Sequence, residues 1–181
     1  MPVTINGDGS ITGLSVGGLG SGVVNTATLA DGAASGSKLT MPSGSVIQTV
    51  QSVKTGIDSY STGSSTLSDS YFDISGLSVS ITPSSGTKCF VSYTVNVGGQ
   101  AGYGQGLALF RDSTQIYLAD ASGNIQRLSN FDYTVDNKKV DSMAGQFLDT
   151  HGANGSTAVT YKLQMYVAEP GWTTRVNRSQ S

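Results

Sequence analysis

Residues 158–167 read AVTYKLQMYV, and their alternation decides the fold class. Every second residue is apolar: Val159, Tyr161, Leu163, Met165 and Val167. The residues between them are Thr160, Lys162, Gln164 and Tyr166. Successive side chains of a β-strand point to opposite faces. The pattern therefore predicts a strand with one face in a core and the other toward water.

The same alternation occurs in two earlier stretches, GLSVSIT at 76–82 and KCFVSYTVNV at 88–97. In the second stretch one face would carry Cys89, Val91, Tyr93, Val95 and Val97. Weaker patterns predict further strands at 45–54, 106–112, 114–119 and 145–150. We find no apolar pattern of helical period, so the crossover helices of a parallel sheet are missing. We therefore predict an all-β fold, an antiparallel jelly-roll-like β-sandwich.

Turn chemistry separates the expected strands. Pro83-Ser-Ser-Gly86 and Asp112-Ser113 favour turns, and Asn154-Gly155 predicts a two-residue hairpin. Residues 132–141, DYTVDNKKVD, mix acids with two lysines. We interpret this stretch as a solvated hairpin or sheet edge, where lysines discourage pairing with other chains.

Composition divides the chain at about Met41. Residues 1–41 contain no aromatic residue and read as an extended, glycine-rich N-terminal segment for anchoring and trimerisation, whereas 42–181 read as the β-sandwich head. Charged residues make up 12% of the chain, and the net charge is -2. This charge favours neither nucleic acid nor an anionic membrane as a partner. A surface so poor in charge suits a protein that associates.

The lone cysteine, Cys89, excludes an intrachain disulfide and is expected to be a small buried hydrophobe. The N-terminus does not resemble a signal peptide, and no apolar run approaches the roughly 18 residues of a membrane span. We expect a soluble chain made in a reducing cytoplasm.

No catalytic or metal-binding motif is complete. The stretch GYGQG at 102–106 lacks the GKS or GKT of a phosphate loop, and we expect a flexible loop between strands. His151 is the only histidine. It lies beside the expected Asn154-Gly155 hairpin, which favours a solvated loop histidine over a catalytic base or a metal ligand at a trimer axis. We expect no catalytic residues, no metal and no cofactor.

Two aromatic residues are candidate carbohydrate platforms. Tyr103 lies in the glycine-rich stretch, and Trp172 follows Glu169-Pro-Gly171. Aromatic rings on loops can stack on sugar faces, and loops on a rigid scaffold often carry recognition. The alternative for Trp172 is that it covers one end of the sandwich core.

Five blocks of the chain carry a family resemblance: 2–19 (PVTINGDGSITGLSVGGL), 41–53 (MPSGSVIQTVQSV), 69–95 (DSYFDISGLSVSITPSSGTKCFVSYTV), 107–116 (LALFRDSTQI) and 160–181 (TYKLQMYVAEPGWTTRVNRSQS). In this order they resemble a module of bacteriophage tail fibres and related virion fibre proteins, frequent in phages of marine bacteria and cyanobacteria. The first block is similar to the opening segment of such fibres. The resemblance spans nearly the whole chain.

The resemblance implies a homotrimer with jelly-roll-like heads, similar in architecture to tumour-necrosis-factor-like trimers. It also implies host attachment or decoration of the particle. In such proteins the block RVNRSQS, here 175–181, runs on into a further apolar strand, whereas this sequence ends at Ser181. We expect this difference to affect the edge of the sheet.

The apolar residues of the first block then have a use. One copy of a glycine-rich segment buries too little apolar surface to offset the conformational entropy lost on ordering. Three copies side by side, or one copy against a docking protein, could share that surface. We expect five residues to serve assembly and anchoring: Ile5, Ile11, Leu14, Val16 and Leu19.

We therefore expect a non-enzymatic structural protein of a phage virion, assembled in the host cytoplasm. It would be a homotrimer that binds other virion proteins through residues 1–22 and a host-surface glycan through its head, without nucleic-acid binding or membrane insertion. One alternative is a capsid or neck cement protein without receptor binding. The other is a fibre-borne enzyme that degrades polysaccharide.

Overall fold

The computed structural model describes residues 3–8, 11–13, 41–62, 70–123, 126–168 and 170–179. The chain forms two compact units, Met1–Ile47 and Gln48–Ser181. The described residues contain strands and no helix. The predicted all-β class is therefore confirmed, while jelly-roll topology and the domain boundary after Met41 stay predictions.

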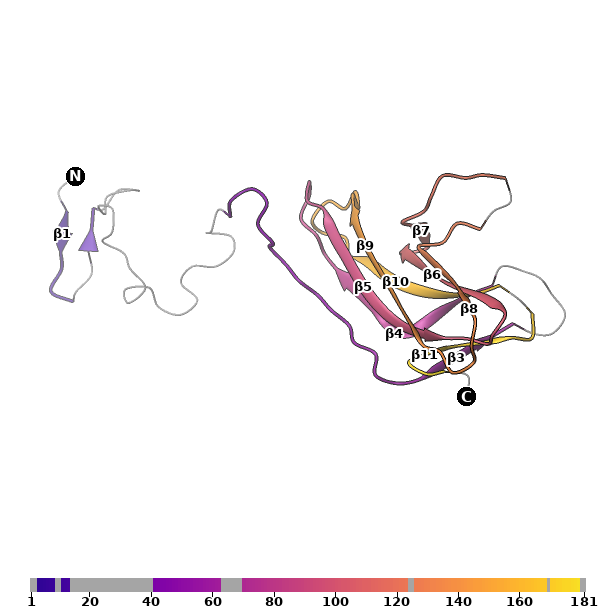
Figure 1. Cartoon of the computed structure of the whole chain (residues 1–181). Coiled ribbons are helices and arrows are strands. Elements are labelled where there is room, and N and C mark those ends of the chain that lie inside the picture. Colours follow the sequence, from indigo (N-terminus) through magenta and orange to yellow (C-terminus); the bar gives the residue numbers. More distant parts are fainter. Residues whose placement is uncertain are drawn as a thin grey trace. The chain divides into compact units, whose positions relative to one another are not determined.

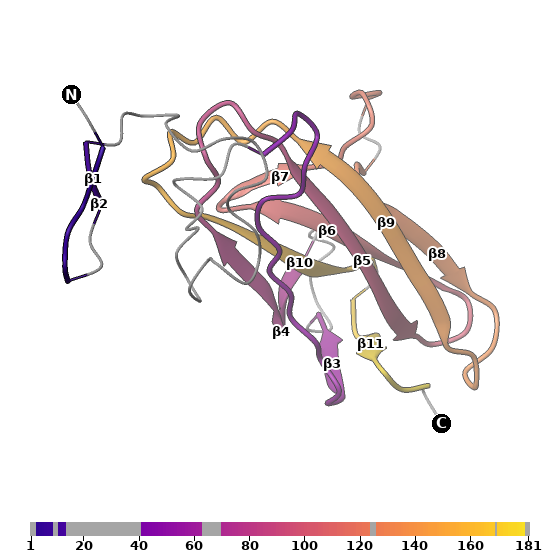
Figure 2. The ribbon, with the colours of Figure 1, turned by 90° about the vertical axis from the view of Figure 1, so that its left-hand side faces the viewer.

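The larger unit is built from two antiparallel sheets (Figures 1 and 2). The five-stranded sheet contains β4 (Ser70–Ile81), β10 (Val159–Val167), β6 (Tyr103–Arg111) and β7 (Thr114–Ile116) in that order, and β8 (Asn130–Thr134) also pairs with β6. The four-stranded sheet has the order β3 (Asp58–Ser61), β11 (Thr173–Val176), β5 (Cys89–Gly98) and β9 (Asp141–Asp149). Figure 2 shows β5 and β9 side by side along much of the head.

The core lies where the predicted apolar faces meet. All five apolar positions of β10 are buried. On β5, Cys89, Val95 and Val97 are buried, and Val91 and Tyr93 on the same face are partly buried and pack against the core. The four residues that alternate with them are exposed. The main cluster includes Val97, Leu107 and Met165 at full burial, and a second cluster contains Cys89, Val159 and Tyr161. The alternation assigned these faces correctly.

The strand predicted at 45–54 is wrong, because these residues form no β-ladder. The part of this segment that belongs to the larger unit is held by a side chain instead. Asn177, whose φ is +59°, donates its amide N–H groups to the carbonyls of Lys54 and Gly56 at 3.0 and 3.2 Å. Period-two alternation shows which face is apolar, but it does not supply a neighbouring strand.

The two-residue hairpin predicted at Asn154-Gly155 is also wrong. Residues 150–158 connect β9 to β10, and these strands belong to different sheets. The local turn chemistry is present all the same: Gly155 has a φ of +89°, and the Asn154 carboxamide accepts the Ser156 N–H at 3.2 Å. The same signal can therefore serve a crossing between sheets.

Two other turn predictions are confirmed. The Thr87 N–H donates to the Ser84 carbonyl at 3.2 Å, and Asp112 turns the chain with a φ of +54°. The segment 132–141 is not a hairpin, because β8 and β9 lie in different sheets, but both are edge strands as predicted.

The smaller unit contains a short antiparallel pair, β1 (Thr4–Ile5) and β2 (Ile11–Thr12), in which Ile5 lies opposite Ile11. Val3 and Ile5 are exposed. Leu14, Val16 and Leu19 lie outside the described residues, so their expected part in assembly stays a prediction.

Candidate functional site

The two aromatic residues singled out in the sequence stack on each other. The rings of Tyr103 and Trp172 lie with centroids 3.8 Å apart and planes 22° apart. Tyr103 is the first residue of β6, and Trp172 directly precedes β11. The stack therefore joins a strand of the five-stranded sheet to a strand of the four-stranded sheet.

Each ring is positioned by a glycine that directly precedes it. Gly102 and Gly171 have φ values of +89° and +76°, a region that glycine enters without steric cost. The Gly102 N–H donates to the Thr134 carbonyl at 2.7 Å, and the Gly171 N–H donates to the Thr62 carbonyl at 2.9 Å. A backbone hydrogen bond of the preceding glycine thus fixes the position of each ring. Both rings are partly exposed, so a ligand can reach the stack.

The surroundings of Tyr103 correct one expectation. Residues 102–106 are not a flexible loop, because β6 begins at Tyr103. A Cβ at Gly104 would clash with the Phe131 ring, and a Cβ at Gly106 would lie 2.7 Å from the Asn130 carbonyl oxygen. These glycines therefore let β8 and the residues before it pack closely on β6.

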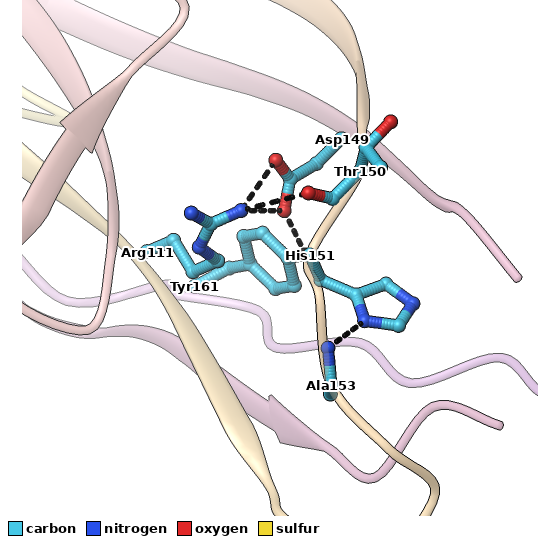
Figure 3. Close-up of polar contacts among 6 residues, drawn as sticks. All are labelled: Arg111, Asp149, Thr150, His151, Ala153 and Tyr161. Atoms are coloured by element: carbon cyan, nitrogen blue, oxygen red, sulfur yellow. Dashed lines mark hydrogen bonds and ion pairs between the residues drawn. The ribbon is translucent and has the colours of Figure 1, made fainter. Parts of the chain in front are cut away.

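The opposite end of β6 carries a buried polar cluster (Figure 3). Its last residue, Arg111, places Nη1 at 2.8 and 2.9 Å from the two carboxylate oxygens of Asp149 on β9. Tyr161 of β10 donates its hydroxyl to Asp149 Oδ2 at 2.6 Å. Burial, and then the bond to Asp149, raise the pKa of the Tyr161 hydroxyl well above its ordinary value. The cluster holds the two sheets together.

His151 is not a solvated loop histidine, and that prediction is wrong. Its side chain is 8% exposed, and its Nδ1 accepts the Ala153 N–H at 2.9 Å. Its Nε2 lies 3.4 Å from Thr87 Oγ1. Figure 3 shows the imidazole ring turned away from the Arg111–Asp149 pair. The ring braces the loop between β9 and β10 and does not form a triad with Asp149.

The geometry of the Arg111–Asp149–Tyr161 cluster is that of a contact that stabilises the fold and not that of a catalytic site. Both oxygens of Asp149 already accept hydrogen bonds from Arg111, and Oδ2 accepts a third from Tyr161. Within the described ranges, no group of three or more histidine, cysteine, aspartate or glutamate side chains could hold a metal ion. The expected absence of catalysis and of a cofactor stays a prediction.

The outer face of the five-stranded sheet carries residues that the sequence did not single out. The aromatic rings of Tyr71, Phe110 and Tyr166 form a cluster there. The centroid of the Tyr71 ring lies 6.1 Å from that of Phe110 and 5.4 Å from that of Tyr166. Beside the rings, Lys162 pairs with Asp73 at 2.9 Å. The polar side of AVTYKLQMYV indicates an outward-facing row of side chains on this strand. Only the register of the sheet shows which side chains of the neighbouring strands lie beside that row.

The outer face of the four-stranded sheet differs in chemistry. Its paired strands β5 and β9 present eight exposed side chains in four cross-strand pairs. None is charged: Phe90 with Leu148, Ser92 with Gln146, Thr94 with Ala144, and Asn96 with Ser142. Phe90 and Leu148 are 65% and 54% exposed. One side of the sandwich is thus free of charge across two long strands.

A hollow of about 190 Å³ lies beside strand β5. It is lined by Ser52, Val53, Lys54, Leu77, Thr94, Val95, Val176 and Asn177. Lys54, one of the lining residues, pairs with Asp58 at 2.8 Å. No arrangement of donors or acceptors in the hollow defines a ligand.

Comparisons with known proteins identify no relative: no family model, no curated protein and no solved structure matches this chain. The described residues contain no helix long and apolar enough to cross a membrane.

Proposed function

We propose that this chain is a structural fibre protein of a bacteriophage virion. It forms a homotrimer without enzymatic activity, is anchored through its N-terminal segment, and attaches the particle to the host surface through its head. The five sequence blocks that resemble virion fibre modules support this proposal, and so does the β-sandwich fold of the head.

The observation that carries the proposal is the uncharged outer face of β5 and β9. Burying a charge in an interface is costly unless it is paired, so the core of a stable interface is depleted of charged residues. Here eight adjacent exposed positions satisfy that condition, and the Phe90–Leu148 pair supplies apolar area at one end. This face suits contact with another copy of the chain.

The N-terminal unit supports assembly by a second route. The β1–β2 pair has two residue pairs, and an isolated two-stranded hairpin is marginally stable in water. Its exposed Val3 and Ile5 gain burial when copies, or another virion protein, cover them. The β1–β2 pair is thus proposed to gain stability on assembly.

Host contact through Tyr103 and Trp172 would be weak for one head. Three linked heads raise the effective concentration of each remaining site once the first has bound. A trimer therefore holds a repetitive glycan more tightly than a single head does.

Size-exclusion chromatography with light scattering at micromolar concentration tests the assembly. We expect the mass of three chains for the wild type and dissociation for Phe90→Lys and Leu148→Lys. Val135→Lys is the matched control, because Val135 is an exposed apolar residue that follows β8. A monomeric wild type would contradict the proposed function. A trimer that survives both lysine variants would remove the observation that carries the proposal, because the interface would then lie elsewhere.

A further inference from the structure

The outer face of the five-stranded sheet arranges its side chains in three rows across β4, β10 and β6. Pairing places Lys162 between Ser78 and Phe110, and Gln164 between Asp73 and Ala108. The third row places Tyr166 between Tyr71 and Gly106. Residues far apart in the chain thus form one continuous surface.

Small residues on β6 leave room for aromatic rings on this surface. Ala108 points away from the core and is nevertheless 0% exposed, so larger side chains cover it. The neighbouring rings belong to Tyr71 and Phe110, whose planes meet at 74°. Both rings stay partly exposed, while Tyr166 is buried beside Tyr71. The rings of Tyr71 and Phe110 are thus packed against each other and still partly exposed to solvent.

A fixed polar group lies next to the rings. The Asp73 carboxylate accepts hydrogen bonds from Gln164 Nε2 at 2.6 Å and from Lys162 Nζ at 3.1 Å. The Lys162 ammonium also lies 5.9 Å from the centroid of the Phe110 ring. The side chains of Asp73 and Lys162 are 62% and 26% exposed. Donors and acceptors are thus held in place and still meet solvent.

From this placement we propose that Tyr71, Asp73, Phe110, Lys162 and Gln164 form a binding site for a neutral hexopyranose glycan. We call these residues the outer aromatic patch. The inference rests on the proposed role in host attachment and names a ligand class and a surface separate from the Tyr103–Trp172 stack.

The chemistry of the patch fits a sugar ring better than a charged polymer. A hexopyranose has an apolar C–H face and a rim of hydroxyls that both donate and accept. The patch offers ring surface beside a carboxylate, an ammonium and an amide. Its two charges are paired and sum to zero, which favours neither a polyanion nor a polycation. Prearranged side chains also lose little freedom on binding.

The test uses four methyl glycosides, of glucose, galactose, mannose and N-acetylglucosamine, and two neutral polysaccharides, dextran and mannan. Saturation-transfer NMR with the full-length protein detects the glycosides, and titration calorimetry measures the polysaccharides. We expect at least one probe to bind. Lys162→Met and Tyr71→Ala should weaken that binding roughly tenfold or more, because each removes a direct ligand contact.

Tyr133→Ala is the matched control, since Tyr133 is an exposed aromatic residue on the edge strand β8. It should leave affinity within about twofold. If Tyr71→Ala fails to fold by thermal unfolding, Lys162→Met decides alone. The proposal is overturned if no probe binds, if Lys162→Met binds as the wild type does, or if only Tyr103→Ala and Trp172→Ala abolish binding. Light scattering of the same samples tests the trimer separately, so the two proposals can fail independently.

Discussion

The hydroxyl of Tyr161 on β10 donates a 2.6 Å hydrogen bond to Asp149 Oδ2 on β9, and this contact joins the two sheets of the head. Arg111 at the end of β6 binds the same carboxylate. At the other end of β6, Tyr103 stacks on Trp172, which precedes β11. One strand is thus linked to the opposite sheet at both of its ends.

Asp149→Ala removes the acceptor for both Arg111 and Tyr161. The Asp149 side chain is 6% exposed, and that of Arg111 is 24% exposed, so the stranded guanidinium is only partly hydrated. We expect the free energy of unfolding to fall by about 2–4 kcal/mol, measured by urea denaturation. Lys139→Ala breaks the more exposed pair with Asp141 and should have a much smaller effect. Equal effects of the two variants would contradict the role assigned to Asp149.

Tyr103→Ala removes the ring that stacks on the only tryptophan. We expect the emission of Trp172 to move toward longer wavelengths, because the indole becomes more hydrated. Stability should fall by about 0.5–1.5 kcal/mol beyond the loss from buried area. Tyr133→Ala, on β8, should leave the emission unchanged. An unaltered spectrum for Tyr103→Ala would show that the stack does not persist in solution.

Gly106→Ala and Gly104→Ala form a matched pair on the same strand. A Cβ at Gly106 would lie 2.7 Å from the backbone carbonyl oxygen of Asn130, which cannot move aside easily. A Cβ at Gly104 would meet the exposed ring of Phe131, which can rotate into solvent. We expect Gly106→Ala to cost about 1–3 kcal/mol and Gly104→Ala less than about 1 kcal/mol, by thermal unfolding. The reverse order would refute this account of the packing.

Alkaline pH should unfold the head through its buried tyrosines. Burial raises the pKa of the Tyr93 hydroxyl from 10.0 to about 12. A raised folded-state pKa contributes stability below pH 10, and that contribution is lost as pH rises toward 12. Absorbance of the tyrosinate should therefore rise in two steps, with the second coinciding with loss of the β-sheet circular dichroism. A single step near pH 10 with the fold intact would contradict this.

Acid should destabilise the head through Asp58 and Asp73. Hydrogen bonds from Lys54 and then Tyr60 lower the pKa of Asp58, and those from Lys162 and then Gln164 lower the pKa of Asp73. A lowered folded-state pKa contributes stability above the unfolded value of 3.8, and that contribution is lost as pH falls through the folded value. We expect Asp73→Asn to flatten the fall in stability below about pH 4, measured by urea denaturation at each pH. An unchanged slope would argue against the Asp73 contacts.

The alternation in the sequence predicted the core faces because it is a local property. Leu163 and Val95 are buried, as the alternation of every second residue predicts. Sheet membership is not local, which is why the sequence predicts a hairpin at Asn154-Gly155 and a strand at 45–54 that the structure does not contain. The burial of His151 has the same origin, because its contact with Thr87 joins residues 64 positions apart in the chain.

The candidate site shows the same limit. The sequence identifies Tyr103 and Trp172 as aromatic residues that each directly follow a glycine, Gly102 or Gly171. The positive φ of both glycines is a finding of the structure. The mutual stacking of the two rings was not foreseeable from residues so distant in the chain. The sequence does not predict the outer aromatic patch, because Tyr71, Phe110 and Lys162 come from three strands and only the register of the sheet brings them together.

The pairing of β4 with β10 has a consequence for how quickly the head forms. Ser80 and Thr160 are 80 positions apart in the chain, yet their hydroxyls hydrogen-bond at 2.8 Å. Such a topology has a high contact order, and the loop-closure entropy must be overcome before most native contacts exist. Refolding from urea should take milliseconds to seconds or longer, so newly made chains spend that interval with unpaired strand edges open to aggregation.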